Sequence, residues 1–400
     1  MTWEIGIIGV ATFVVSCALT YLLKGTAKHI GLIDVPNERS SHAVPTPRGG
    51  GLAIAVSSLL ALSVLAGSGL VPSRLFLALV PSGAAVAAVG FVDDRWTLSA
   101  RIRLLVHFMA ASWAVLWIKP VDLFAFERGA PLLEGLVYVL STLGIVWFLN
   151  MYNFMDGIDG IAGTQAVFMS LGTVVLSVLS VGITYAVAPA IVIGAASLGF
   201  LLWNWPPAKI FLGDIGSGYL GFVFAVIGLA SGIHDPVAPW TLLILAGVFA
   251  VDATFTVIRR FLRGERITQP HRTHGFQLLA KKLGHRKVTS SIALVNLLWL
   301  LPCALATAAW PQSVDWILPL ALCPLIIGAF AIGAGSRAET LTDSEPAPTA
   351  RISPAVTIPF PTATLKHRTP IQTREHYATR LAHQHPSSNT IERLSVNDSR

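Results

Sequence analysis

LLEGLVYVLSTLGIVWFLNMYNFMDGIDG, residues 132–160, joins a membrane-length apolar run to a cluster of polar side chains. Residues 132–149 are long enough for a helix across the hydrocarbon core of a bilayer. The polar side chains that follow are Asn150, Asn153, Asp156 and Asp159. An Asp at the centre of a lipid-facing helix costs about 2.5–3.5 kcal/mol, so we expect these groups at a water-facing rim or in a functional cavity. The alternative is a hydrophilic loop whose two glycines make a turn.

The composition decides the class of protein. In 400 residues, 54% are hydrophobic and 12% are charged, and the mean hydropathy is +0.66. Soluble domains carry about a quarter of charged residues. The apolar stretches have the length of membrane helices, not of the roughly ten-residue alternating strands of an outer-membrane barrel. The composition therefore predicts an all-α, polytopic integral membrane protein.

Eleven apolar segments qualify as spans, which predicts about eleven transmembrane helices. They are residues 3–23, 51–70, 75–92, 104–118, 132–149, 161–180, 184–203, 216–232, 238–258, 288–307 and 314–333. The first is expected to be a retained span, since Glu4 stands before its apolar run and no basic residue does. After residue 333 the chain is rich in Ser, Thr, Pro and charge, which predicts a disordered tail over 334–400.

The distribution of Lys and Arg predicts the orientation, because these residues concentrate in cytoplasmic loops. With the N-terminus outside, the inside loops hold 17 of the 28 Lys and Arg residues, the outside loops hold 3 and the tail holds 8. Every polar cluster then faces the cytoplasm, and so does the tail. The basic residues lie beside the spans, which favours contact with anionic lipid and not with nucleic acid.

The loop between the first two spans, residues 24–50, predicts a phosphate site. It contains Arg39 and Arg48 and ends in a run of glycines where the next span begins. Backbone amides at a glycine-rich helix start, with arginines nearby, favour a phosphate group. The alternative is an ordinary basic cytoplasmic loop.

Two further clusters place carboxylates at the inside ends of spans. Asp93 and Asp94 end the third span, and adjacent carboxylates can hold a divalent cation or share a proton. The alternative is that these carboxylates lie at a solvated helix end and pair with Arg101 and Arg103. Asp214 lies among glycines before the eighth span, where a metal ion or phosphate can approach closely, or where it caps the helix.

The most basic loop, residues 259–287, contains His271, Arg272 and His274. Two histidines three residues apart suit a metal, but the arginine between them favours an anion. The alternative is charge that only sets the topology. Asp252 lies within the preceding span, where a functional role is the default for an ionisable residue.

Together these clusters match the needs of an enzyme that acts on a pyrophosphate. Such an enzyme needs hard oxygen ligands for a divalent cation and cationic side chains for the remaining phosphoryl charge. Competing classes are a secondary transporter, which predicts carboxylates at the bilayer midplane, and a non-catalytic scaffold. The carboxylates cluster at one rim instead, and a membrane setting suits a lipid-borne acceptor.

Residues 1 to about 333 resemble the polyprenyl-phosphate N-acetylhexosamine-1-phosphate transferases of glycosyltransferase family 4, because five motifs occur in that family's order. The motifs are Asp34-Val-Pro-Asn-Glu-Arg39, Asp93-Asp94, Asn150 to Gly160, Phe211-Leu-Gly-Asp214-Ile-Gly-Ser and His271-Arg-Thr-His274. The resemblance implies transfer of a sugar-1-phosphate from a UDP-sugar to undecaprenyl phosphate, with release of UMP and with Mg²⁺ or Mn²⁺ as the cofactor. It also implies a bacterial inner membrane protein with a cytoplasmic active site, and it leaves a homodimer open.

The resemblance also implies roles for individual residues. Asn153 and Asp214 would bind the metal. The expected catalytic residues are Asp93 and Asp94, at the lipid phosphate, and Asp156 and Asp159, at the nucleotide-sugar end. The expected substrate-binding residues are Arg39, Arg48, Asn150, His271, Arg272 and His274.

The loop Arg272-Thr-His-Gly-Phe-Gln277 resembles the branch of the family that primes O-antigen or exopolysaccharide chains. That branch uses UDP-N-acetylglucosamine or 6-deoxy relatives such as N-acetylfucosamine and N-acetylquinovosamine. The triple-histidine loop of the muramyl-pentapeptide transferases does not occur here, which argues against peptidoglycan synthesis. His107 stands where many relatives are expected to have Gln.

Overall fold

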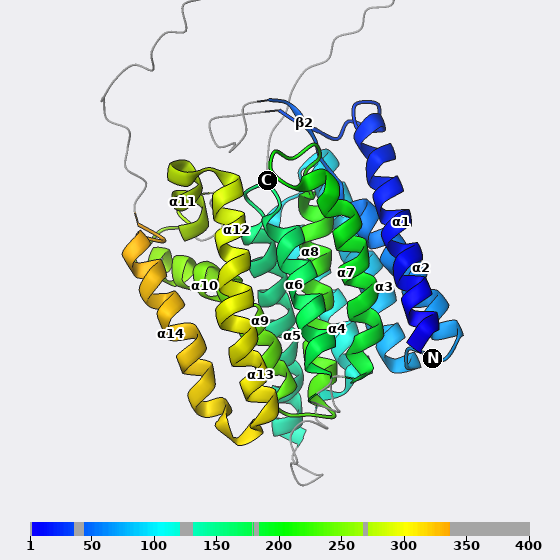
Figure 1. Ribbon diagram of the computed structural model, residues 1–400, viewed down its shortest axis with the longest axis vertical. Helices are drawn as coiled ribbons and strands as arrows, with labels where there is room; N and C mark the ends of the chain where they lie inside the picture. The colour runs from blue at the N-terminus through cyan, green and yellow to red at the C-terminus, as the bar shows by residue number, and fades with distance from the viewer. Residues whose placement is uncertain are drawn as a thin grey trace, which may run out of the picture. The chain divides into compact units, whose positions relative to one another are not determined.

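The helices of the computed structural model follow the apolar segments of the sequence (Figure 1). The structure describes residues 2–35, 44–120, 131–177, 179, 184–266 and 271–336. Its elements are α1 (Thr2–Thr26), β1 (Ile33–Asp34), β2 (Thr46–Pro47), α2 (Gly51–Gly67), α3 (Ser73–Trp96), α4 (Ala100–Ile118), α5 (Pro131–Met155), α6 (Ile161–Leu176), α7 (Thr184–Asn204), α8 (Gly213–Gly232), α9 (Ala238–Leu245), α10 (Gly247–Leu262), α11 (Gly275–Leu283), α12 (His285–Val295), a π-helical turn (Asn296–Leu300), α13 (Leu301–Ala309), a 3₁₀ turn (Pro311–Ser313) and α14 (Val314–Ile332).

Each of the eleven predicted spans coincides with helix, but not all have the expected length. Among the described residues, eight helices are long and apolar enough to cross a membrane, or nine if the bent pair α9–α10 counts as one span. α2 and α6, with 17 and 16 residues, extend only about 25 Å at 1.5 Å per residue. This is slightly less than the hydrocarbon thickness of about 30 Å. The polytopic, all-helical class is confirmed.

The ninth predicted span, residues 238–258, is not one straight helix. α9 and α10 meet at Ala246 with a bend of 78°. The apolar run continues through the bend, so composition alone did not indicate it. The other additions to the predicted elements are α11, a short amphipathic helix in the basic loop, and the two-residue strands β1 and β2. These strands pair antiparallel, with Ile33 opposite Pro47.

α8 is the central helix of the bundle. It packs against α2, α3, α4, α5, α7 and α9, and most of its residues are buried. Close packing relies on small residues, because a Cβ on Gly51 of α2 would come within 2.3 Å of the Gly216 backbone. Glycines of this kind let helix backbones approach in a membrane. The N-terminus of α8 is thereby held among the ends of its neighbours.

The connections with polar motifs lie at one end of the bundle, where Figure 1 shows β2 and α11, while the N-terminus lies at the other end. Backbone bonds join these connections, since Phe211 N donates to Pro47 O at 2.8 Å and Gly50 N donates to Phe211 O at 2.9 Å. Of the expected tail, residues 337–400 lie outside the described residues. Residues 36–43, which include Arg39, also lie outside them.

Candidate active site

The start of α8 carries Asp214, and a carboxylate from another helix caps it. Asp94, in the last turn of α3, accepts the backbone N–H groups of Asp214 at 3.0 Å and Ile215 at 3.2 Å. Its side chain is fully buried. Gly213 makes this approach possible, because a Cβ there would lie 2.3 Å from the Asp94 carboxylate. Gly213 also has a φ of +79°, which favours glycine. A carboxylate at a helix N-terminus satisfies free amides and complements the helix dipole.

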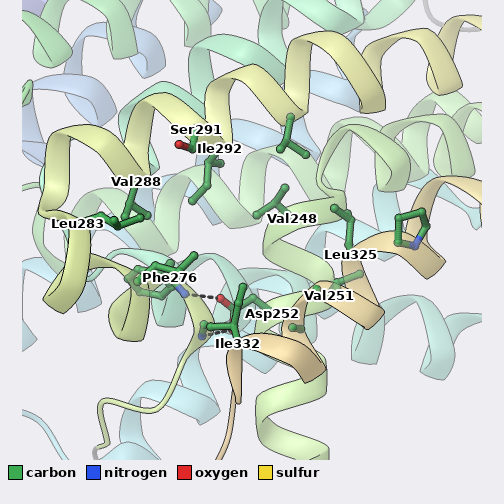
Figure 2. Close-up of a pocket in the computed structure, with 16 residues that line it drawn as sticks. Val248, Val251, Asp252, Phe276, Leu283, Val288, Ser291, Ile292, Leu325 and Ile332 are labelled. Atoms are coloured by element: carbon green, nitrogen blue, oxygen red, sulfur yellow. Dashed lines mark hydrogen bonds between the residues drawn. The ribbon is translucent and has the colours of Figure 1, made fainter.

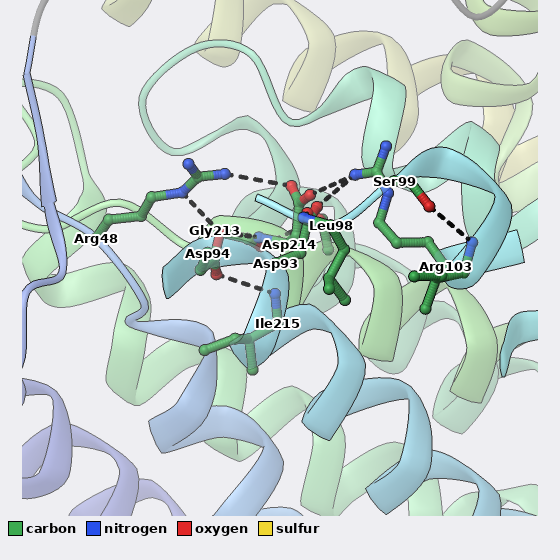
Figure 3. A network of polar contacts seen from close by, with 11 residues as sticks. Arg48, Asp93, Asp94, Leu98, Ser99, Arg103, Gly213, Asp214 and Ile215 are labelled. Atoms are coloured by element: carbon green, nitrogen blue, oxygen red, sulfur yellow. Dashed lines mark hydrogen bonds and ion pairs between the residues drawn. The ribbon is translucent and has the colours of Figure 1, made fainter. Parts of the chain in front are cut away.

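Two arginines flank this pair of carboxylates (Figure 3). Arg48, just after β2, places Nε 2.7 Å from Asp94 Oδ1 and Nη2 3.4 Å from Asp214 Oδ1. Arg103, in the first turn of α4, places Nη1 2.9 Å from Asp214 Oδ2 and also contacts Asp93 Oδ2. Burial alone would lower the pKa of Arg48, but the carboxylates of Asp94 and Asp214 outweigh it and raise that pKa.

Asp93 completes the cluster from the last turn of α3. Its Oδ1 accepts the backbone N–H of Leu98, which fixes the connection between α3 and α4. Three carboxylates, on Asp93, Asp94 and Asp214, thus face two guanidinium groups. With all five groups ionised, the cluster has a formal charge of −1, which favours binding of a cation.

Asp156 follows the end of α5 and belongs to the same electrostatic site. Burial and the Asp214 carboxylate raise the pKa of Asp156 to about 8, although Arg48 opposes the shift. Near neutral pH its carboxyl group is therefore mostly protonated. One turn earlier, Asn153 accepts the Asp156 backbone N–H at 3.2 Å through its own carbonyl. Asn150 donates from its amide to Val146 O at 2.7 Å, within α5.

Asp159 connects three segments. Its Oδ2 accepts the backbone N–H of Ala208 at 3.0 Å, and its Oδ1 lies 3.2 Å from His285 Nδ1. Its carbonyl accepts the hydroxyl of Thr289 at 2.8 Å. The turn after α5 is in this way held against the connection before α8 and against α12. His285 was not singled out from the sequence, where it is one of many basic residues in its loop.

The two histidines of the basic loop stack on one another, with ring centroids 4.9 Å apart. His274 is buried and caps α11, and its ring lies 6.3 Å from that of Phe154 on α5. Burial, His274 and Arg260 lower the pKa of His271 to about 4. The neutral ring of His271 lies 3.0 Å from the Thr273 hydroxyl. Arg272, between the histidines in sequence, is half-buried.

Asp252 holds this loop in place. Its Oδ1 and Oδ2 accept the backbone N–H groups of Gly275 and Phe276, both at 2.9 Å. Its Oδ1 also lies 3.4 Å from His274 Nδ1. What the structure shows for Asp252 is helix capping, because it anchors the N-terminus of α11 to α10.

The structure thus brings together Arg48, Asp93, Asp94 and Asp214, with Asp156 beside them, and places His271 and His274 near the end of α5. Besides His285, sequence reasoning did not assign Arg103, which bridges two carboxylates. Its position in the first turn of a span, after the N-cap Ser99, was the available signal. Arg39 lies outside the described residues.

The oxygen donors of this cluster suit a Mg²⁺ ion that is held partly by substrate and water. They do not suit a metal ion bound by protein side chains alone. No three His, Cys, Asp or Glu side chains within the described residues are arranged to hold an ion. Mg²⁺ commonly binds through one or two carboxylates plus substrate phosphates and water. Asp214 and the amide of Asn153 are donors of the required kind.

Known proteins resemble this chain across the site. Residues 76–232 match the family model described as Glycosyl transferase family 4. A probable undecaprenyl-phosphate N-acetylglucosaminyl 1-phosphate transferase of Bacillus subtilis is 32% identical over 305 residues, which cover 72% of this chain and 82% of the relative. A decaprenyl-phosphate N-acetylglucosaminephosphotransferase of Mycobacterium tuberculosis is 31% identical over 326 residues, covering 73% and 80%. A phospho-N-acetylmuramoyl-pentapeptide-transferase of Thermosynechococcus vestitus is 37% identical over 188 residues, covering 42% and 46%.

Proposed function

The chain belongs to glycosyl transferase family 4 and is a polyprenyl-phosphate N-acetylhexosamine-1-phosphate transferase; from this premise we propose that the donor is a UDP-sugar and that the acceptor is undecaprenyl phosphate. An oxygen of the lipid phosphate forms a bond to the phosphorus that carries the sugar. The bond from that phosphorus to the bridging oxygen breaks, and UMP leaves with the bridging oxygen. One phosphoanhydride replaces another, so the reaction needs no ATP.

The observation that carries this proposal is the cluster of Asp93, Asp94 and Asp214 with Arg48 and Arg103 at one end of the bundle. Phosphoryl transfer depends mainly on positioning and on stabilising charge at the phosphoryl oxygens. Five charged side chains from four segments supply both. A membrane bundle with this cluster at its polar end suits a donor that is soluble and an acceptor that is a lipid.

Asp214 and Asn153 are the proposed ligands of Mg²⁺, with Mn²⁺ as a substitute. The family typically depends on Mg²⁺, which when bound neutralises phosphoryl charge. Arg48 and Arg103 hold the Asp214 carboxylate from two sides, so its orientation is set before substrates arrive. Such preorganisation lowers the reorganisation needed during reaction.

The Asp93–Asp94 pair is proposed to serve the lipid phosphate in two ways. Asp93, paired with Arg103, is assigned to the charge of the acceptor phosphate, while Asp94 orients α8 through its amides. A phosphomonoester has a second pKa of about 6 and is largely ionised at neutral pH. The role of the pair is therefore mainly electrostatic, and a strong base is unnecessary.

The remaining motif residues are proposed to hold the donor. Asp156 and Asp159 would lie at its nucleotide-sugar end. The residues assigned to its diphosphate or sugar are Arg39, Arg48, Asn150, His271, Arg272 and His274. The stacking of the His271 and His274 rings gives them a fixed spacing. Neutral imidazoles can donate hydrogen bonds to phosphoryl oxygens.

For the sugar and pathway, we propose N-acetylglucosamine or a 6-deoxy relative and the priming of O-antigen, exopolysaccharide or another cell-envelope glycan. The chain covers 82% and 80% of the two relatives from Bacillus subtilis and Mycobacterium tuberculosis, and the names of both include N-acetylglucosamine. The muramoyl-pentapeptide relative matches only 42% of this chain. The proposed location is a bacterial inner membrane with the site on the cytoplasmic side. A homodimer is compatible with this arrangement.

UMP release by the purified protein tests the proposal. Undecaprenyl phosphate, Mg²⁺ and a panel of UDP-N-acetylhexosamines are supplied, with reactions lacking the lipid or the metal as controls. Release that needs both lipid and metal supports the proposed reaction, and the best donor names the sugar. Folded protein that releases no UMP with any donor would contradict it.

A further inference from the structure

The break between α9 and α10 frees a backbone carbonyl inside the bundle. Leu245, the last residue of α9, precedes the 78° bend. Its carbonyl accepts a hydrogen bond from Gln165 Nε2 of α6 at 3.0 Å. Where no water is available, a freed backbone group in a membrane needs a partner from a neighbouring helix. Gln165, which is 1% exposed, supplies that partner.

Asn296 holds Gln165 in the orientation that this bond requires. Its Nδ2 donates to Gln165 Oε1 at 2.7 Å, and the Asn296 side chain is fully buried. Asn296 also begins the π-helical turn between α12 and α13. Such turns are uncommon and occur often at functional sites. A chain of two hydrogen bonds therefore joins three separate parts of the bundle at the break.

The direction in which α10 leaves the break determines where α11 begins. Asp252 on α10 accepts the first amides of α11, those of Gly275 and Phe276 (Figure 2). An apolar cavity of about 230 Å³ lies between α10, α11, α12 and α14. Val248, Leu279 and Ile292 are among the residues that line it. On this side of α10 close packing is incomplete, so its orientation depends more on the polar bonds made at the break and by Asp252.

We propose that Gln165 and Asn296 are positioning residues that act on the donor site through α10 and Asp252. By holding the Leu245 carbonyl, they fix the direction of α10, and with it the start of α11 and the stacked pair His271 and His274. This inference rests on the proposed function, in which that pair contacts the UDP-sugar.

Kinetics of Gln165→Met and Asn296→Leu test the inference. Each variant removes the polar chain and leaves an apolar side chain of similar size. We expect the KM for the UDP-sugar to rise about tenfold, since small displacements of positioning groups have large effects, while the KM for undecaprenyl phosphate stays within about twofold. The matched control is Ser170→Ala, also on α6, whose buried hydroxyl has no hydrogen-bond partner among the described residues. It should leave both constants unchanged.

Two further variants separate positioning from general stability. Gln165→Glu should restore the donor KM, because a carboxyl group in an apolar interior stays protonated and can donate to Leu245 and accept from Asn296. The double variant Gln165→Met/Asn296→Leu should be no worse than Gln165→Met alone, because both residues act through one chain of bonds. Equal rises in both KM values, additive effects or no rescue by Gln165→Glu would overturn the inference.

A distance measurement tests the inference without activity. Spin labels at Lys282→Cys on α11 and Arg101→Cys on α4 are introduced after Cys17, Cys303 and Cys323 are replaced by Ser. Both labelled positions are exposed. We expect a narrow distance distribution that Gln165→Met broadens or shifts and Ser170→Ala does not. An unchanged distribution in Gln165→Met overturns the positioning role, whereas absence of UMP release in the wild type concerns the proposed function alone.

Discussion

Asp94 accepts a hydrogen bond from the backbone nitrogen of Asp214 at 3.0 Å, although 120 positions separate the two residues. The same arrangement recurs at the start of α11, where Asp252 accepts the first amides of that helix. In both places an Asp on one helix caps the N-terminus of another helix, and a sequence motif lies at that N-terminus. Asp94 and Asp252 thus act on the backbone, whereas the carboxylates of Asp93 and Asp214 pair with Arg103.

We expect Asp94→Asn to lower the free energy of unfolding by about 1 kcal/mol or more, because a capping carboxylate is replaced by a neutral group. The amide oxygen keeps one acceptor for α8, but the ion pair with Arg48 is lost. Thermal unfolding in detergent measures the change. Asp156→Asn is the control, since the pKa of Asp156, about 8, leaves it mostly neutral at pH 7. Equal stability losses in the two variants would refute the capping role.

Asp214→Asn should reduce turnover by about 100-fold or more, which is typical for loss of a principal electrostatic group. Expression should stay close to wild type. UMP release at saturating donor and lipid measures the effect. Asp235→Asn is the matched control, because Asp235 follows the opposite end of α8, and it should retain turnover within about twofold. Near-normal, metal-dependent turnover in Asp214→Asn would remove Asp214 from the proposed metal site.

The neutral state of His271 predicts a pH dependence of stability. Its pKa is lowered from 6.5 to about 4 in the folded protein, so between these values the unfolded chain binds a proton that the folded chain does not. Stability from His271 is then present above pH 6.5 and is lost as the pH falls towards 4. The loss is less than about 1.4 kcal/mol per pH unit.

Thermal unfolding of wild type and His271→Gln at pH 7.5 and pH 5 checks this expectation. The wild type should lose more stability on acidification than the variant, because Gln does not titrate. Parallel losses in the two proteins would mean that the His271 pKa is close to its ordinary value.

Hydropathy and segment length were sufficient to predict the positions of the apolar helices, but not that of the amphipathic helix α11. These properties are local, and a bilayer makes them decisive because each span must satisfy its own backbone hydrogen bonds. The motif positions were also evident, since Asp93, Asp156 and Asp214 stand beside apolar runs where polar residues are costly. That these residues gather around one site followed only from loop parity and the resemblance.

Other features depend on contacts that have no local signal. The bend at Ala246 interrupts a continuous apolar run, and it is supported by Gln165, about 80 residues earlier. The capping of α8 by Asp94 requires the left-handed Gly213 and a particular packing of α3 on α8. Arg103 looked like an ordinary basic residue at a helix start. Its bridging role exists only because α4 and α8 meet at their N-terminal ends.

The orientation of the chain yields a last prediction, because the side of the membrane on which the site lies rests on the distribution of Lys and Arg. Arg266→Cys, in the loop after α10, should react with a membrane-impermeant maleimide only from the cytoplasmic side. Arg74→Cys, at the start of α3, should react only from the outside. Both positions are exposed, and the three native cysteines are first replaced by Ser. Intact cells and inverted membrane vesicles provide the two sides. Labelling of Arg266→Cys in intact cells would show that the orientation is the opposite of the predicted one. A cytoplasmic UDP-sugar would then have no access to the site.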